Sequence, residues 1–149
     1  MTRILALVFA AFIPLTAIAA DDPDSAPEAL IRPAGDSDLS EFLWTNRPVV
    51  VFSDSPSDPR YQEQIELLAE RPDMLRERDV VVLTDTDPAA RSPVRRKLRP
   101  RGFQLVLLDK DGSIRLRKPS PWSIREIIRS IDKSPDRQHE VEERRERRE

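Results

Sequence analysis

The chain has 149 residues, with 25 basic and 27 acidic side chains and a formal net charge of −2. This is the length of one ordinary domain, and a hydrophobic content of 38% can form one core. Cysteine is absent and histidine occurs once, which excludes disulfides, thiol chemistry, iron–sulfur clusters and the usual zinc sites. We therefore expect one domain with no cofactor and no metal, and the sequence indicates no catalytic residue.

The N-terminal segment has the pattern of a secretory signal peptide. An apolar run begins at Ile4 behind a single cation, Arg3, and ends in small residues. A membrane anchor is the alternative, but the run contains Pro14 and is shorter than the roughly 20 residues of a spanning helix. We therefore predict that residues 1–19 are a signal peptide cleaved near Ala19. The protein is then periplasmic or secreted, with no membrane span after cleavage.

The rest of the chain divides by composition into three parts. Residues 20–37 are rich in Asp, Pro, Ala and Ser without apolar periodicity, and are predicted to form a flexible leader. Residues 38–135 contain the apolar runs and form the predicted domain. Residues 136–149 alternate acids and bases around one apolar residue, Val141, and predict a solvated helical tail that frays unless it packs on the domain.

The first elements of the domain are a short segment and a strand. Leu39, Phe42 and Leu43 recur at helical spacing, and are expected to contribute to the core. The run from Arg47 to Ser53 is β-branched and lacks polar alternation, which indicates a strand buried on both faces. This run is the predicted central strand of a sheet.

A helix is expected next, followed by a second strand. Asp58 is placed to cap the helix with Pro59 at its first position, and Pro72 is expected to end it. The run from Val80 to Thr84 predicts a second buried strand, so that the β-helix-β order implies a right-handed parallel crossover. A short basic helix is expected from Ser92 to Leu98.

The end of the domain is predicted to be a hairpin and a helix. Strands are expected at Phe103–Leu108 and Ile114–Arg117, joined by Asp109–Gly112, where Asp-Gly is a strong hairpin signal. A last helix is expected to begin at Ser120 and to stop at Pro135. Its apolar stripe consists of Ile124, Ile127, Ile128 and Ile131.

This order of elements resembles the thioredoxin-like fold. The resemblance implies an α/β fold class, with a central mixed four-stranded sheet in which a parallel β-α-β pair precedes an antiparallel hairpin, flanked by helices. Residues 101–112 are similar to the thioredoxin segment that carries the substrate-binding cis-proline, whose place is taken here by Gln104. Residues 54–60 stand in the place of the Cys-x-x-Cys motif and hold no sulfur. The resemblance therefore implies the architecture without thiol–disulfide exchange.

A closer resemblance covers the chain from Leu39 to Glu140. It rests on Phe42, Trp44, Arg47-Pro48, Val51-Phe52, Arg78-Asp79, Val80-Val81, Lys110-Asp111-Gly112, Ile131-Asp132, Pro135, Arg137 and Glu140. These marks resemble a family of small exported bacterial domains of unknown function, regarded as thioredoxin-like and cysteine-free. The resemblance implies a fold and export, and it implies no known activity.

A first candidate site lies in the loop of residues 54–60. A helix N-terminus favours an anion there, and the predicted ligand-binding residues are Arg47, Asp54, Arg60 and Gln104. Asp58 is explained more simply as a helix cap. The alternative is an enzyme in which Asp54 is a base and Arg60 or Arg47 clamps an anion.

A second candidate is the basic stretch from Arg91 to Arg101, which contains six cations and no acid. It could meet an anionic envelope polymer, a lipid head group or an acidic protein surface, and a solvated helix is the simpler interpretation. Nucleic acid is not expected, because no aromatic residue is interleaved for base stacking. The predicted partner contacts are Arg95, Arg96, Lys97, Arg137 and Glu140, of which the last two could instead attach the tail to the domain.

The sequence therefore favours an exported, non-enzymatic, non-redox domain that binds an envelope protein or an anionic ligand. It assigns no oligomeric state. The carboxylate- and arginine-dependent enzyme at the loop of residues 54–60 stays open as the alternative.

Overall fold

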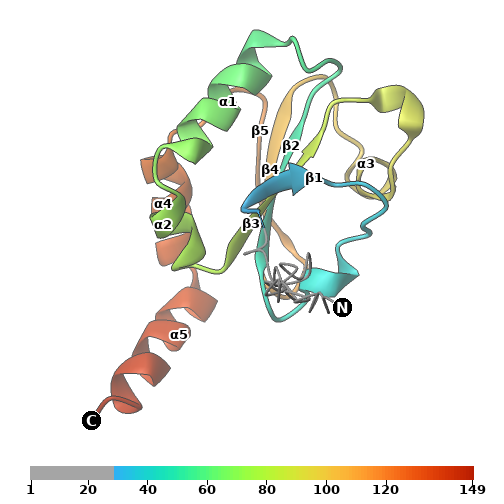
Figure 1. Cartoon of the computed structure of the whole chain (residues 1–149). Helices are drawn as coiled ribbons and strands as arrows, with labels where there is room; N and C mark the ends of the chain where they lie inside the picture. Colours follow the sequence, from blue (N-terminus) through green and yellow to red (C-terminus); the bar gives the residue numbers. More distant parts are fainter. Residues whose placement is uncertain (1–28) are drawn as a thin grey trace, which may run out of the picture.

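The structure, a computed structural model, describes residues 29–149. Within them, five strands form one mixed sheet in the order β1-β3-β2-β4-β5, with helices on both faces (Figure 1). The predicted signal peptide and the first part of the leader lie outside the described residues. From residue 29 onward, no helix combines the length and hydrophobicity needed to cross a bilayer.

The centre of the sheet is formed by β2 (Arg47–Phe52) and β3 (Val80–Asp85), which run parallel. Every residue of β2 is buried, as expected for a β-branched strand covered on both faces. Strand β4 (Gln104–Leu108) lies antiparallel on the other side of β2 and pairs with β5 (Ile114–Lys118). The predicted central strand, parallel crossover and antiparallel hairpin are therefore confirmed.

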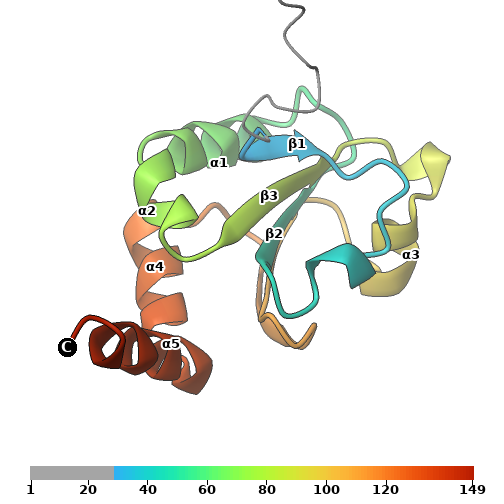
Figure 2. The same cartoon turned by 60° about the horizontal axis from the view of Figure 1, so that its bottom comes forward.

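Helices α1 (Pro59–Ala69), α2 (Pro72–Arg76) and α4 (Ile124–Asp132) cover one face of the sheet (Figure 2). The four isoleucines of α4 are buried there, as their spacing predicts. The opposite face is covered by the 3₁₀ turn η1 (Ser40–Phe42) and by α3 (Pro93–Leu98), with a second 3₁₀ turn, η2 (Pro88–Ala90), between β3 and α3. Each face thus has its own apolar core.

A fifth strand occupies part of the segment predicted to be a flexible leader. Strand β1 (Ile31–Pro33) pairs in parallel with β3, and the N–H of Ala34 continues the pairing by donating to the carbonyl oxygen of Thr84. Three residues are too few to show an alternating pattern, so their strand conformation depends on the backbone partner that the edge of β3 provides. The ordered domain therefore begins before residue 38.

Three helix boundaries differ from those expected. Pro72 begins α2 after α1 has ended, and Pro135 begins α5 (Pro135–Glu146) after α4 has ended. Proline suits the first turn of a helix, whose N–H groups have no partner inside it, so the same residue marks a start as readily as a stop. Helix α4 begins at Ile124 instead of Ser120, because Ser123 caps it in a capping box with Glu126.

The loop of residues 39–46 and the β4–β5 turn lie together at one end of the sheet. Leu39 and Phe42 are buried as expected, whereas Leu43 is 40% exposed and does not belong to the core. In the turn, only Gly112 has a positive φ, of 84°, and its N–H donates to the carbonyl oxygen of Asp109. A Cβ on Gly112 would lie 2.9 Å from Cδ2 of Leu43, so the two loops are in close contact.

Candidate functional site

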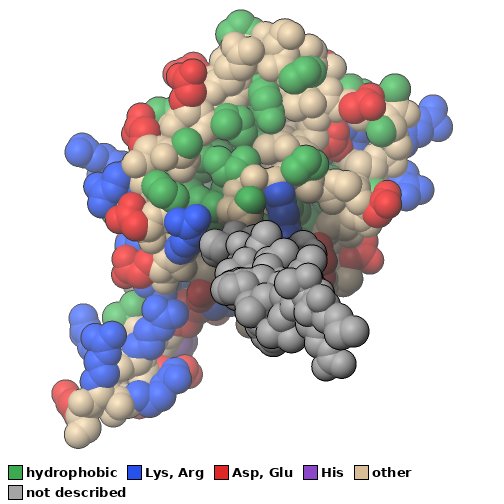
Figure 3. All heavy atoms as spheres, viewed as in Figure 1, with side chains coloured by type: hydrophobic (Ala, Val, Ile, Leu, Met, Phe, Trp, Pro, Cys, Tyr) green, Lys and Arg blue, Asp and Glu red, His purple; other side chains and the backbone are tan. Residues whose placement is uncertain are grey.

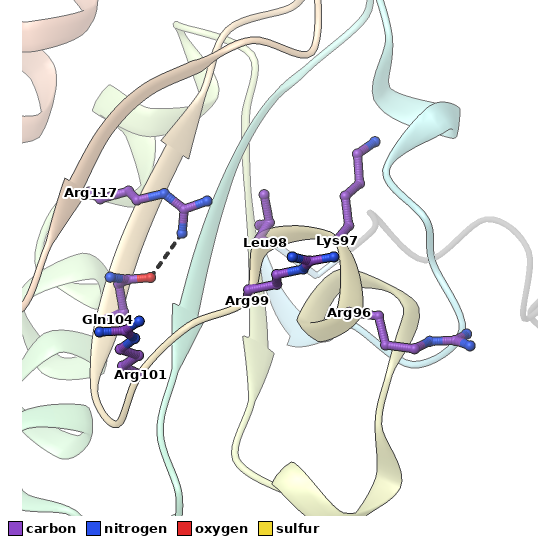
Figure 4. Close-up of a pocket in the computed structure, with 7 residues that line it drawn as sticks. All are labelled: Arg96, Lys97, Leu98, Arg99, Arg101, Gln104 and Arg117. Atoms are coloured by element: carbon purple, nitrogen blue, oxygen red, sulfur yellow. Dashed lines mark hydrogen bonds between the residues drawn. The ribbon is translucent and has the colours of Figure 1, made fainter.

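An open groove of about 630 Å³ lies between the end of α3 and the β4–β5 pair (Figure 4). Its lining residues come from three segments of the chain: Arg96, Lys97, Leu98, Arg99, Arg101, Gln104 and Arg117. Five of these seven side chains are cationic and none is acidic. We call this feature the basic groove.

The local structure of α3 explains how these cations reach the groove. Val94 and Leu98 are one helical turn apart and are buried against the sheet, which leaves Arg96 and Lys97 on the exposed side. The helix ends at Arg99, which adopts the left-handed conformation with φ 49°. The chain then turns sharply into β4, so the end of the helix and the start of the strand form neighbouring walls.

Most of the groove's charge is not neutralised by the protein. Nη1 of Arg117 donates to Oε1 of Gln104 over 2.9 Å, and Nζ of Lys97 donates to the carbonyl oxygen of Asp38 over 3.3 Å. The guanidinium groups of three other arginines have neither a hydrogen bond nor an ion pair within residues 29–149: Arg96, Arg99 and Arg101. Guanidinium groups bind phosphate and carboxylate in a bidentate manner, so the groove is suited to an anion.

The groove joins residues that the sequence analysis assigned to two different sites. Gln104 was expected in the ligand site, and Arg96 and Lys97 in the partner contact; the structure brings all three together. The sequence analysis did not assign Arg117 to any site. Its cross-strand partner is Val106, which packs in the core beneath α3, so Arg117 emerges on the α3 side of the sheet. Alternation along β5 indicates that Arg117 faces away from Leu116, but only the strand pairing places it beside α3.

The structure separates Arg47 from the other residues predicted to bind a ligand at the 54–60 loop, whereas Gln104 pairs opposite Phe52 at the end of β2 from which this loop starts. Asp58 caps α1 and pairs with Arg60, whose Nη2 lies 3.0 Å from Oδ2 of Asp58. Asp54 is exposed at the carboxyl end of β2, whereas Arg47 is buried at the amino end of the same strand. On the order of 20 Å of extended chain separates them. The expectation that Arg47 serves this loop is therefore wrong, because Arg47 begins β2 and the loop follows the opposite end of that strand.

Arg95 has a structural role that its place in the basic stretch did not indicate. Its Nη2 lies 3.0 Å from Oδ1 of Asp85 and also donates to the carbonyl oxygen of Ser53. Burial alone would raise the pKa of Asp85, but hydrogen bonds from Arg95 and Ser92 outweigh this effect and lower it. The Arg95 side chain is 12% exposed, so it is committed to the fold and is not free to contact a partner.

A second charged cluster attaches α5 to the sheet. Arg47 is fully buried, and its Nη2 lies 2.8 Å from Oε1 of Glu140 on α5. Lys110 in the β4–β5 turn bridges Glu140 and Asp79, with both distances 2.8 Å. Arg137, which is 4% exposed, pairs with Glu140 over 3.2 Å. We call Arg47, Lys110, Arg137 and Glu140 the latch.

The latch gives Glu140 an unusual acidity. Burial opposes ionisation, but hydrogen bonds from Arg47, Lys110 and Arg137 outweigh it and lower the pKa of Glu140 from 4.5 to about 2. Beyond the latch, α5 projects from the domain with acidic and basic side chains intermixed along it (Figure 3). Two roles were considered for Arg137 and Glu140: contact with a partner, and attachment of the tail to the domain. The ion pairs of the latch support the second role.

The fold and the absence of cysteine define a class: a thioredoxin-like α/β domain that cannot carry out thiol–disulfide exchange with its own residues. Residues 38–140 match the family described as a domain of unknown function, DUF4174, and the chain belongs to that family. The matched region ends at Glu140, so it includes the whole latch. The predicted membership of a family of unknown function with a thioredoxin-like fold is thus confirmed.

Solved structures support the fold. The chain is similar to reduced 2-Cys peroxiredoxin of Plasmodium vivax, with a TM-score of 0.52 and 18% identity over 70% of this chain and 84% of that one. It is also similar to Prx1a of Plasmodium yoelii modified at the N-terminus, with a TM-score of 0.50 and 19% identity over 70% of this chain and 80% of that one. None of the curated proteins matches the chain.

Proposed function

We propose that this protein is a non-enzymatic domain of the bacterial envelope that binds an anionic ligand in the basic groove. One observation carries the proposal: five cations from α3, the α3–β4 loop and β5 line the groove without an acidic residue. The whole chain is net acidic, with a charge of −2, so the groove carries a local excess of positive charge that the overall composition does not show.

The cost of gathering like charges supports the same conclusion. Elsewhere the buried or half-buried arginines pair with carboxylates, as Arg47 does with Glu140 and Arg95 with Asp85. In the groove, Arg99 and Arg101 have no such partner within the described residues. Cations held close together repel one another, and a bound anion removes that repulsion. A ligand that carries phosphate or carboxylate groups fits this arrangement.

The envelope part of the proposal is supported by sequence alone. The apolar run that begins at Ile4 has the length and the small-residue ending of a cleaved export signal. A cysteine-free domain is equally stable in a reducing or an oxidising compartment, so its composition is compatible with export.

Inorganic tripolyphosphate is a suitable probe for the groove. Titration calorimetry on the mature protein at low salt should detect binding that weakens as the salt concentration rises. The triple variant Arg99→Ala, Arg101→Ala and Arg117→Ala should lower affinity about 100-fold, at roughly 1 kcal/mol for each charge-assisted contact at an exposed site.

The matched control removes the same charge elsewhere. Arg76, Arg125 and Arg129 are exposed on α2 and α4, which cover the other face of the sheet. Their triple alanine variant should bind tripolyphosphate as the unchanged protein does. Equal losses in both variants would mean that net charge alone attracts the probe, and no binding by the unchanged protein would overturn the proposal.

A further inference from the structure

Three large hydrophobic side chains of the described residues are markedly exposed, and they lie at one end of the sheet. They are Leu43, 40% exposed, Trp44, 75% exposed, and Ile114, 44% exposed. Leu43 contacts the β4–β5 turn at Gly112, and the N–H of Trp44 donates to the carbonyl oxygen of Lys110 in that turn. Ile114 follows two residues after Gly112. We call Leu43, Trp44 and Ile114 the apolar tip.

The conformation of Trp44 is costly in isolation. Its φ is 63°, in the left-handed region that bulky side chains rarely adopt, and its indole is mostly in water. The hydrogen bond to Lys110, at 2.7 Å, holds it in this conformation. An arrangement that strains the backbone and exposes a tryptophan does not serve the core, and it is typical of a residue that contacts something outside the chain.

The apolar tip and the basic groove adjoin each other. Lys97 lines the groove and also lines the small hollow beneath Leu43 and Gly112. Phe42 of η1 and Leu98 of α3 pack in one core, on one face of the sheet. Figure 2 shows η1, the β4–β5 hairpin and α3 gathered on the side of the molecule away from α1. The two features therefore meet at Lys97, on the face of the sheet that α3 covers.

The shape of the tip excludes a peptide-binding cleft at this place. The hollow beneath it holds only about 10 Å³, which is too small for an amino-acid side chain. The tip projects from the surface and forms no cavity for a ligand. It is therefore suited to a partner into which the Trp44 indole can insert. Of the acidic side chains near the tip, Asp109 lines the hollow beneath it. Asp36, Asp38 and Glu41 line a separate hollow towards β1, and none of the four lines the groove.

We propose that the anion bound in the groove is the head group of an anionic lipid, and that the apolar tip enters the surface of the bilayer that carries it. This rests on the proposed anion binding. Cations attract anionic lipids at about five-fold in affinity for each Lys or Arg near the surface. Tryptophan is favoured at the boundary between head groups and acyl chains, where its ring is apolar and its N–H meets water. Together the two features provide the two signals that stable surface binding needs.

Vesicles test this directly. The mature protein is mixed with vesicles of phosphatidylcholine alone or with phosphatidylglycerol added, and binding is measured by co-sedimentation. Because the chain has two tryptophans, the variant Trp122→Phe leaves Trp44 as the only indole that reports. We expect binding only to vesicles with phosphatidylglycerol, a blue shift of Trp44 emission, and quenching of that emission by brominated lipid.

Surface variants separate the two contributions. Trp44→Ala should lower vesicle affinity about ten-fold, from the loss of roughly one buried apolar side chain, and should leave tripolyphosphate binding unchanged. Arg99→Ala with Arg101→Ala should lower vesicle affinity about 25-fold. The control Arg125→Ala with Arg129→Ala removes two cations from α4 and should leave vesicle affinity unchanged.

The outcomes distinguish this inference from the proposed function. If the protein binds tripolyphosphate but not vesicles, the lipid inference is overturned and the proposed function stands. The same conclusion follows if the groove binds a soluble polymer or an acidic protein instead of a bilayer. Vesicle binding without a shift of Trp44 emission, and without loss in Trp44→Ala, overturns insertion of the tip. Binding of neither probe removes both proposals.

Discussion

Nη2 of Arg47 lies 2.8 Å from Oε1 of Glu140, although the two residues are 93 positions apart in the chain. The pair connects the first residue of β2 to the middle of α5. Arg47 also donates to the carbonyl oxygen of Arg78 over 3.0 Å, so one guanidinium group holds the start of β3 and the final helix together. The charged C-terminal segment is thus partly a structural element of the domain.

Removing Glu140 should destabilise the fold. In Glu140→Ala, the fully buried Arg47 loses its carboxylate and remains as an uncompensated charge, which costs about 3 kcal/mol. Urea unfolding followed by circular dichroism measures the change. Glu143→Ala is the matched control, because Glu143 lies on the same helix in an exposed pair with Arg147 at 3.5 Å. The control should change stability by no more than about 0.5 kcal/mol, and equal effects in both variants would contradict a role for the latch.

The latch should also make stability depend on pH in the acidic range. The pKa of Glu140 is lowered from 4.5 to about 2 in the folded protein, so its stabilising contribution is complete above about pH 4.5. That contribution is lost as the pH falls from 4.5 through 2, because the unfolded chain then binds the proton more readily. Allowing for the partial exposure of the carboxylate, the loss is about 2 kcal/mol.

The difference between the unchanged protein and Glu140→Gln isolates this contribution from other carboxylates. The gap in unfolding free energy between the two should narrow as the pH is lowered from 6 towards 2. A gap that stays constant over that range would show that the ionised form of Glu140 does not stabilise the fold.

Two neighbouring arginines of α3, Arg95 and Arg96, should contribute very differently to the stability of the fold. Arg95→Ala leaves Asp85, whose side chain is 6% exposed, without its cation, and should cost about 3 kcal/mol of stability. Arg96→Ala removes an exposed side chain from the basic groove and should change stability by less than about 0.5 kcal/mol. Thermal unfolding checks both. A similar melting temperature for the two variants would refute the structural role of Arg95.

The export signal makes a separate prediction. Expressed in a Gram-negative bacterium, the chain should be recovered outside the cytoplasm with its N-terminus near Ala20, as read by mass spectrometry of the intact protein. Ala17→Arg with Ala19→Arg should block cleavage, because the peptidase requires small residues there. An uncleaved chain confined to the cytoplasm would exclude the envelope as its location.

The fold was largely predictable from local patterns. Strand β2 was predicted from the run between Arg47 and Ser53, because a continuous β-branched run is typical of a strand covered on both faces. The stripe of isoleucines in α4 is recognised because its spacing matches one face of a helix. Strand β1 was not predicted, because three residues are too few to show a periodicity. Leu43 was expected in the core from its helical spacing, but it is 40% exposed.

The candidate site was predictable only in part. The basic stretch predicted a contact role for Arg96 and Lys97. Local sequence, however, does not distinguish an arginine that is paired or buried in the fold from one that is exposed and unpaired. Arg95 differs from Arg96 only because Asp85 lies within reach of one and not of the other. Arg117 joined the groove through the pairing of β5 with β4, which sequence spacing does not specify.

By itself, the sequence determined the α/β class, the order of the main elements and the absence of thiol chemistry, because these depend on residue type and on periods of two to four residues. Tertiary structure alone decided which charges meet. Arg47 and Glu140 form a pair, and Arg99 and Arg117 share a groove, through contacts between segments far apart in the chain. Because ion pairs form only between groups a few ångströms apart, local sequence patterns do not predict which residues far apart in the chain will interact.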